Sequence, residues 1–294
     1  MTSVSERVFI VGGTGNVGAK TVRELIDKKI PVTLYARTPE KVHGMFKSEL
    51  VSVVRGDYED LSPLKEGLRG HTRLFLLIAD LKKMVEYKKQ IALWAYEAGV
   101  QQVVDISSAW VSFPWRSTPI GTLHYYSEKA IFDLPNRGSY VTLRPGRFMS
   151  NLMLFDGPQG DRVLDVLEAD AIQGWISPND IGSVAAVVLS EEVEKHHDAV
   201  YELSGDLATP AQRTDYLSRA VGRPLTYQKI TAAEKYDRIM STGYFKHTFA
   251  YCLAASATTV DMQHLHITDG IEILLRRKPE TLEQYILANK DAFK

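Results

Sequence analysis

Cysteine is almost absent from this chain of 294 residues, which holds a single one, Cys252. One cysteine cannot form an internal disulfide or build a thiolate metal site. A reducing cytoplasm is therefore the expected location. Cys252 itself stands in the apolar run FAYCLAA and is expected to be a small buried side chain.

Long apolar runs are absent as well. No stretch approaches the ~20 consecutive apolar residues that a membrane-spanning helix needs. The N-terminal residues MTSVSERVF lack the apolar centre of a signal peptide. We therefore expect a soluble protein that does not bind a membrane.

An excess of charge of one sign is the third absence. The 35 lysine and arginine residues balance 36 aspartate and glutamate residues, a formal net charge of -1. This balance provides no long-range field for binding a phosphodiester backbone, so a small molecule is expected as partner and nucleic acid is not. His196 and His197 stand in the charged stretch EEVEKHHDAV without a spaced third ligand, which predicts a solvated face and no metal site.

What the chain does have is a regular alternation of strand-like and helix-like segments. Near-continuous apolar runs are typical of parallel strands buried on both faces. The alternation predicts an α/β fold, a doubly wound parallel sheet of the Rossmann type. The expected strands cover residues 7–11, 32–36, 52–54, 73–79, 102–107 and 140–144, and a typical helix covers 83–98.

This rhythm changes after Arg144, and the last third of the chain is mostly helical in pattern. We expect residues 1–155 to form a nucleotide-binding domain, with 172–205 returning to the sheet. Residues 156–171 and 206–294 are expected to form a smaller, mostly helical lobe that binds substrate.

The stretch VFIVGGTGNVG, residues 8–18, joins the first strand to a helix through glycines that can be read in two registers. Gly13, Gly15 and Gly18 form G-x-G-x-x-G, whereas Gly12, Gly15 and Gly18 form G-x-x-G-x-x-G. In such a turn the missing Cβ atoms let the backbone approach a pyrophosphate, and the free N–H groups of the helix favour its charge. The alternative is a glycine turn that only packs the helix on the strand.

The ends of the next two strands carry the following clues. A carboxylate after the second strand would bond the ribose 2′-hydroxyl of NAD, but Arg37 stands there and suits the 2′-phosphate of NADP(H). Lys41 offers a second cation. Asp57, after the third strand, is expected either to accept a hydrogen bond from the adenine amino group or to cap the next helix.

An ordered series of motifs runs through nearly the whole chain: VGGTGNVG, RGDYED, AYEAGVQQVVDISS, HYYSEKA, LRPGRFMSNL, WISPNDIGSVAAVVL, YELSG and RRKPETLEQYI. This series resembles the NmrA-like group of atypical short-chain dehydrogenase/reductases, which includes NADPH quinone reductases, isoflavone-reductase-like enzymes and redox-sensing regulators. The resemblance favours the register Gly12, Gly15, Gly18 and implies NADP(H) as the cofactor.

The resemblance also implies a catalytic set. Tyr125 and Lys129 have the Tyr-x-x-x-Lys spacing, so Tyr125 would exchange a proton with the substrate while Lys129 binds the nicotinamide ribose and lowers the tyrosine pKa. Ser108 would orient the substrate. Because Ser108 and Tyr125 are closer in sequence than is usual for this pair, Tyr125 is alternatively an aromatic bystander. His124, five residues before Lys129, would then be a substrate or structural residue.

The remaining implied contacts complete the expected site. The cofactor is expected to contact Gly12, Thr14, Gly15, Asn16, Val17, Gly18, Arg37, Asp57, Ala79, Ser107, Lys129, Pro145 and Phe148. The substrate is expected to contact Trp110, His124, Phe148 and Asn151.

Three functions are open at this point. The first is an NADPH-dependent oxidoreductase that transfers a hydride to a quinone, carbonyl or activated double bond of a small, conjugated substrate. The second is an NADP(H)-sensing regulator without turnover. The third is a non-redox enzyme, an isomerase or cyclase, on the same scaffold. The sequence leaves the assembly open, with a homodimer among the options.

Overall fold

The computed structural model describes residues 6–259 and 266–293, and the chain divides into two compact units. The first unit comprises Met1–Ser108, Leu123–Arg144 and Ile181–Tyr201. The second comprises Ala109–Thr122, Pro145–Asp180 and Glu202–Lys294. The functions predicted for the two parts, cofactor binding and substrate binding, stay predictions.

The first unit is built on a seven-stranded sheet with the order β3-β2-β1-β4-β5-β6-β9. Every pairing from β3 across to β6 is parallel. The predicted doubly wound parallel sheet is therefore confirmed. The strands are β1 (Val8–Val11), β2 (Val32–Ala36), β3 (Val51–Arg55), β4 (Arg73–Leu76), β5 (Gln102–Ile106), β6 (Ser139–Pro145) and β9 (Val200–Leu203).

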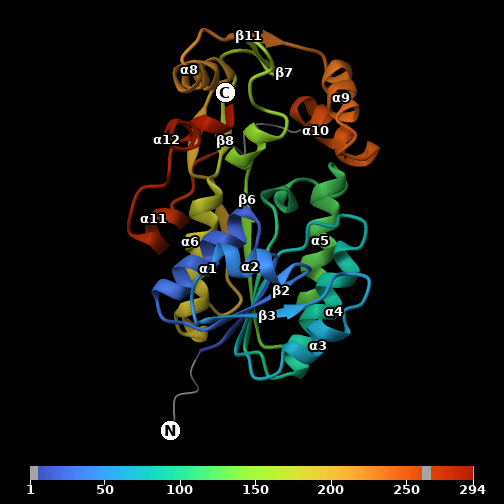
Figure 1. Ribbon diagram of the computed structural model, residues 1–294. Coiled ribbons are helices and arrows are strands. Elements are labelled where there is room, and N and C mark those ends of the chain that lie inside the picture. The colour runs from blue at the N-terminus through green and yellow to red at the C-terminus, as the bar shows by residue number, and fades with distance from the viewer. Residues whose placement is uncertain (1–5, 260–265, 294) are drawn as a thin grey trace. The chain divides into compact units, whose positions relative to one another are not determined.

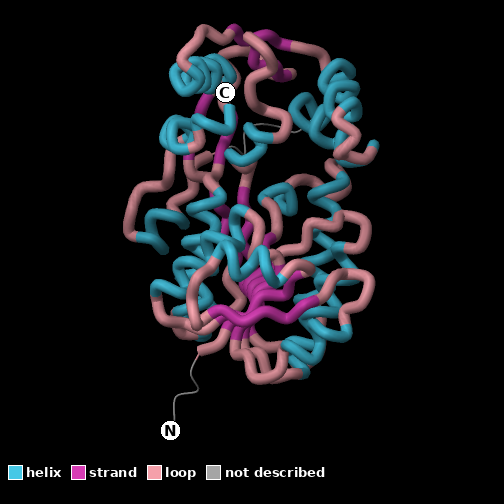
Figure 2. The backbone as a smooth tube through the Cα atoms, viewed as in Figure 1, coloured by secondary structure: helices cyan, strands magenta, loops and turns pink. Residues whose placement is uncertain are grey.

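Helices cover both faces of this sheet (Figures 1 and 2). On one face α1 and α6 pack closely. The missing Cβ of Gly182 permits this, since a Cβ there would lie only 2.7 Å from the carbonyl oxygen of Val17. The other face carries α3, α4 and α5. The helices are α1 (Asn16–Asp27), α2 (Pro39–Met45), α3 (Ser62–Gly67), α4 (Met84–Glu97), α5 (Pro119–Phe132), α6 (Pro178–Ser190) and α7 (Val193–His196).

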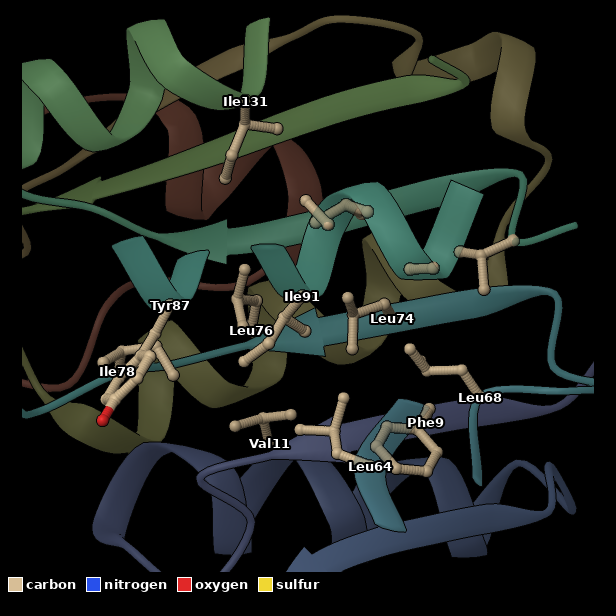
Figure 3. Close-up of a cluster of buried hydrophobic side chains, with 14 of the residues drawn as sticks. Phe9, Val11, Leu64, Leu68, Leu74, Leu76, Ile78, Tyr87, Ile91 and Ile131 are labelled. Carbon is tan, nitrogen blue, oxygen red and sulfur yellow. The ribbon is translucent and has the colours of Figure 1, made fainter. Parts of the chain in front are cut away.

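The core between the sheet and α3, α4 and α5 is apolar (Figure 3). Leu74 and Leu76 of β4, Tyr87 and Ile91 of α4 and Phe9 of β1 are all buried in this core. Each buried side chain of this size contributes about 1.5–3 kcal/mol through removal from water. The apolar strand pattern of the sequence thus reflects burial on both faces of the sheet.

The second unit is mostly helical, as predicted. Two small sheets brace it, with β10 antiparallel to β8 and β11 parallel to β7. Three of its helices begin with a capping box, at Thr209, Thr231 and Thr281, so local sequence places their first turns. Its elements are η1 (Ala109–Ser112), η2 (Met149–Met153), β7 (Arg162–Asp165), β8 (Gln173–Trp175), β10 (Asp206–Ala208), α8 (Pro210–Val221), β11 (Thr226–Lys229), α9 (Ala232–Ser241), α10 (His247–Thr259), α11 (Gly270–Leu275), α12 (Leu282–Ala288) and η4 (Lys290–Phe293).

A buried ionic cluster stands within the second unit. The carboxylate of Asp165 lies 2.9 Å from a guanidinium nitrogen of Arg213 and 2.8 Å from the ammonium of Lys235. Arg147 approaches the same carboxylate at 3.7 Å and also pairs with Asp156. The three cations hold the pKa of Asp165 well below its usual range, although burial acts in the opposite direction.

Two sequence predictions about local structure were wrong. The fourth strand ends at Leu76 and not at residue 79; the N–H of Leu77 still donates to the carbonyl oxygen of Val11 in β1 at 3.2 Å, and residues 78–79 follow outside the strand. His196 is buried, with its ring nitrogens 2.8 Å from the hydroxyl of Tyr201 and 2.8 Å from the carboxylate of Glu191. A solvent-exposed position was predicted for both His196 and His197, and of the two His197 is the exposed one. The short α7 turns one histidine inward and the other outward.

Candidate functional site

The candidate site lies in the first unit, at the carboxyl edge of its sheet. From β1 the chain continues to β2 and β3 on one side, whereas β4, β5 and β6 lie on the other. The strand order therefore reverses between β1 and β4, and open α/β sheets bind ligands in the crevice outside such a switch point. The segments that follow β1 to β5 all emerge at this edge.

The glycine turn after β1 is tightly packed against neighbouring backbone and side-chain atoms. Gly12 adopts φ +89°, a conformation that favours glycine, and a Cβ there would lie 2.9 Å from the carbonyl oxygen of Leu77. A Cβ on Gly13 would lie 2.8 Å from the side chain of Leu34, and one on Gly18 would lie 2.3 Å from the carbonyl oxygen of Gly12. Gly12, Gly13 and Gly18 are therefore required by the fold itself.

Gly15 is different from the other glycines of the turn. The nearest atom to a Cβ there would be the carbonyl oxygen of Gly12 at 3.7 Å, so the fold leaves the space beside Gly15 open. Gly15 is also the N-cap of α1, and no side chain of the described residues caps that helix. Asn16 and Gly15 are exposed, and the first N–H groups of α1 are thus available to an anion. The turn fits a pyrophosphate.

Arg37 follows β2 at the same edge and is exposed. Neither Arg37 nor Lys41 forms an ion pair with any residue that the structure describes. Two unpaired cations beside the end of β2 suit an added phosphate. Ala79, which follows β4, is also exposed.

Asp57 lies in the loop after β3. One of its carboxylate oxygens accepts a hydrogen bond from the N–H of Glu59 at 2.8 Å, so it closes a turn. Asp57 does not cap α3, since Asp60 accepts the hydrogen bond from the N–H of Ser62, the first residue of that helix. The Tyr35 hydroxyl anchors the loop by donating to the carbonyl oxygen of Asp57. A contact of Asp57 with adenine stays a prediction.

Ser107, directly after β5, belongs to a three-residue chain of polar contacts. Its hydroxyl donates to Glu128 of α5, and the same carboxylate pairs with the guanidinium of Arg144 in β6 through two nitrogens, at 3.0 and 2.5 Å. Ser107 is buried, and both partners are largely so. Glu128 and Arg144 were not among the residues predicted for the site, and their one sequence signal is their place inside the motifs HYYSEKA and LRPGRFMSNL.

Tyr125 and Lys129 lie one turn apart on the exposed side of α5. The ammonium of Lys129 lies 2.6 Å from the carboxylate of Asp133, which raises the lysine pKa. The two residues share a helix face, as their spacing predicts. Ser108 follows Ser107 after β5. The catalytic roles of Ser108, Tyr125 and Lys129 stay predictions.

His124 lies on the inner side of α5, beside a buried ion pair that sequence analysis did not predict. The ammonium of Lys88 lies 2.7 Å from a carboxylate oxygen of Asp105, and both side chains are fully buried. The Tyr140 hydroxyl donates to the other oxygen of Asp105. The one sequence signal for this ion pair is the charged Asp105 inside the apolar strand β5. Burial, and then the positive charge of Lys88, lower the pKa of His124 well below its usual value.

Buried neutral histidines are expected to make the stability of the first unit depend on pH. Burial lowers the pKa of both His71 and His124 from 6.5. Below pH 6.5 the unfolded chain therefore takes up these protons more readily than the folded chain, and the free energy of unfolding should fall as the pH falls, by at most about 1.4 kcal/mol per pH unit for each histidine. Urea denaturation between pH 7.5 and 5.5 measures this slope. A His71→Gln, His124→Gln double variant with an unchanged slope would contradict the assignment.

The other predicted contacts belong to the second unit. Trp110 of η1 stacks on Phe113 with ring centroids 6.3 Å apart. Phe148 is the N-cap of η2 and forms a parallel bridge with Ile176, while Asn151 lies within η2. Pro145 ends β6. The predicted contacts of Trp110, Pro145, Phe148 and Asn151 with cofactor or substrate stay predictions.

Comparison with known proteins identifies the family. The profile of the NmrA-like family matches residues 4–286. The chain belongs to the NmrA-like family. Within the described residues of this NmrA-like protein no helix is long and apolar enough to cross a membrane, and no three His, Cys, Asp or Glu side chains are grouped to hold a metal ion.

Several relatives of this NmrA-like protein are named reductases. A (4-alkanoyl-5-oxo-2,5-dihydrofuran-3-yl)methyl phosphate reductase of Streptomyces griseus subsp. griseus is 31% identical over 225 residues, 76% of this chain and 77% of that protein. An NAD(P)H azoreductase of Xenophilus azovorans is 25% identical, covering 80% of this chain and 81% of its own. A solved NADPH-dependent quinone oxidoreductase from Escherichia coli, complexed with NADPH, has a TM-score of 0.80 at 23% identity, covering 96% and 99%.

Proposed function

We propose that this NmrA-like protein is an NADPH-dependent oxidoreductase of the atypical short-chain dehydrogenase/reductase type. The observation that carries the proposal is the open Gly15 turn at the start of α1, with the unpaired Arg37 at the end of the neighbouring strand β2. A pyrophosphate and a 2′-phosphate are the two anionic groups of NADP(H), and each meets a suitable partner here. Reductases among the relatives support the same function.

The residues of the first unit would divide the work of binding. The N–H groups of Asn16 and Val17 would hold the pyrophosphate, and Arg37 the 2′-phosphate. NADPH, when bound, supplies the hydride, so the protein has to supply position and electrostatics. We assign proton delivery to Tyr125, with Lys129 holding the ribose, and substrate orientation to Ser108.

The substrate we propose is a small conjugated molecule whose quinone, carbonyl or activated double bond accepts the hydride. The relatives support this class, since their names include a quinone oxidoreductase, an azoreductase and a reductase of an oxo-dihydrofuran phosphate. Quinone, azo and oxo-dihydrofuran groups are all conjugated, and each can accept a hydride.

The test is NADPH oxidation measured with a panel of quinones, enones, azo compounds and aldehydes. We expect turnover with at least one class, and kcat/KM at least tenfold higher with NADPH than with NADH. Arg37→Gln should remove this preference because the guanidinium contributes only to the cofactor that carries the 2′-phosphate. Arg69→Gln, an exposed arginine paired with Glu66 on another part of the unit, is the control. Equal use of both cofactors by the parent would overturn the assignment of Arg37.

The same assay separates the two alternatives. An NADP(H)-sensing regulator would bind NADPH with the Arg37-dependent preference but oxidise it with none of the panel. A non-redox enzyme would convert a substrate without net NADPH oxidation. A Tyr125→Phe variant measured beside the parent tests the proton donor, for which we expect about a hundredfold loss of kcat, within the range of general acid catalysis.

A further inference from the structure

We propose that Glu128 is a positioning residue that fixes the direction of the Ser107 hydroxyl, so that Ser107 presents only hydrogen-bond acceptors to the cofactor. The inference rests on the proposed function, since NADPH is the ligand concerned. It assigns a task to a buried carboxylate that the catalytic set does not use.

The position of Ser107 is set by the sheet. Ile106 of β5 is in register with Leu143 of β6, and the N–H of Ser107 donates to the carbonyl oxygen of Leu143 at 2.8 Å. Ser107 is thereby held at the carboxyl edge, on the β4, β5, β6 side of the switch point. The Gly15 turn and Arg37 lie toward the β1, β2, β3 side. A dinucleotide that crosses the switch point with its pyrophosphate at α1 brings its nicotinamide half to the side of Ser107.

The acceptor character of Ser107 follows from the hydrogen-bond donors and acceptors of Ser107 and Glu128. A serine hydroxyl has one hydrogen to donate and two lone pairs to accept with. The hydrogen of Ser107 is committed to Glu128. An ionised glutamate has acceptor oxygens and no donor. Two nitrogens of Arg144 compensate the negative charge of Glu128. Ser107 is left with lone pairs, which suit an N–H or O–H donor such as the carboxamide or a ribose hydroxyl of the nicotinamide nucleotide.

Replacing Glu128 by glutamine is expected to weaken the hold on the serine hydrogen. The Ser107 hydroxyl and Nε of Arg144 share one carboxylate oxygen, and a second nitrogen of Arg144 contacts the other, so a glutamine would offer one acceptor oxygen to three donors. The serine hydrogen would then be free to turn outward, toward a group that also donates. We expect the Kd of NADPH, measured by titration calorimetry without substrate, to rise about tenfold in Glu128→Gln.

A second variant shows whether Glu128 acts through the serine. Ser107→Ala should raise the Kd of NADPH by a similar factor, and adding Glu128→Gln to it should cause no further rise. If Glu128 had a purely structural role, Glu128→Gln would raise the Kd of NADPH further in the Ser107→Ala variant. Ser107→Ala alone decides the proposal if Glu128→Gln does not fold, because an unchanged Kd in that variant overturns it.

The chain provides a matched control in the same unit. Ser183 of α6 donates to Glu24 of α1, and Lys20 lies 3.0 Å from the same carboxylate. Glu24→Gln removes the same charge from another Ser–Glu–cation set, and we expect an unchanged Kd. An equal rise in Glu24→Gln and Glu128→Gln would overturn the proposal, since it would report a general structural effect of removing a paired carboxylate. If the parent protein itself binds no NADPH, the proposed function fails, and not this assignment alone.

Discussion

Replacement of Asp165 by asparagine is expected to lower the free energy of unfolding by about 3–5 kcal/mol, the usual cost of leaving buried charges without a partner. The carboxylate of Asp165 is fully buried and contacts Arg213, Lys235 and, at longer range, Arg147. Asparagine keeps the size of the side chain but removes its charge. Asp156 would still pair with Arg147, but Arg213, which is fully buried, and Lys235 would lose the carboxylate that each contacts.

Urea denaturation followed by tryptophan fluorescence measures this loss, because the ring of the buried Trp175 contacts the guanidinium groups of both Arg147 and Arg213 in the same unit. Asp161→Asn is the control, since that carboxylate is exposed and lies 3.6 Å from the exposed Arg162. An exposed pair contributes about 0–1 kcal/mol, so the control should be close to the parent. A loss below 1 kcal/mol in Asp165→Asn would show that the cluster relaxes or admits water.

The second large effect is expected from Gly18→Ala. The added Cβ would lie 2.3 Å from the carbonyl oxygen of Gly12 and 2.8 Å from the Cα of Gly13, both of them backbone atoms. No flexible side chain can move to relieve these contacts, so the turn itself has to open. We expect the affinity for NADPH to fall at least a hundredfold, equivalent to about 2.7 kcal/mol, together with a loss of stability. Calorimetric titration and urea denaturation measure the two losses.

Gly15→Ala separates a folding role from a binding role within the same turn. Its Cβ would meet only an atom at 3.7 Å, and Gly15 has φ -85°, which any residue adopts. We expect unchanged or slightly higher stability but weaker NADPH binding, because the added methyl group occupies the space that the pyrophosphate approaches. If Gly15→Ala bound NADPH as tightly as the parent, the pyrophosphate would not lie over this turn.

The two registers of the glycine stretch differ in Gly12 and Gly13, and the register that binds the cofactor stays a prediction. Both Gly12 and Gly13 are required, one for its positive φ and one for its contact with Leu34. The sequence could not choose between them because either pattern is compatible with a turn from strand to helix. Contacts with Leu34 of β2 and with Leu77, the residue after β4, explain why both positions are glycine.

Much of the fold could be predicted from sequence because its causes are local. Apolar strands of limited length and a glycine turn act over a few residues, and they indicated the parallel sheet and its carboxyl edge. The place of Arg37 also followed from chain order, since the residue after β2 must emerge beside the turn after β1. Periodicity placed Tyr125 and Lys129 on one helix face, but it did not show that this face is exposed.

By itself, then, the sequence determined the doubly wound sheet, the glycine turn, and the cation at the end of the second strand. Only the tertiary structure decided which polar groups meet: Ser107 with Glu128, Asp105 with Lys88, and Asp165 with its three cations. The partners in these contacts are far apart in the chain and lie on different elements. Their pairing depends on how helices pack on strands, and once buried, each group requires a partner that no local pattern specifies.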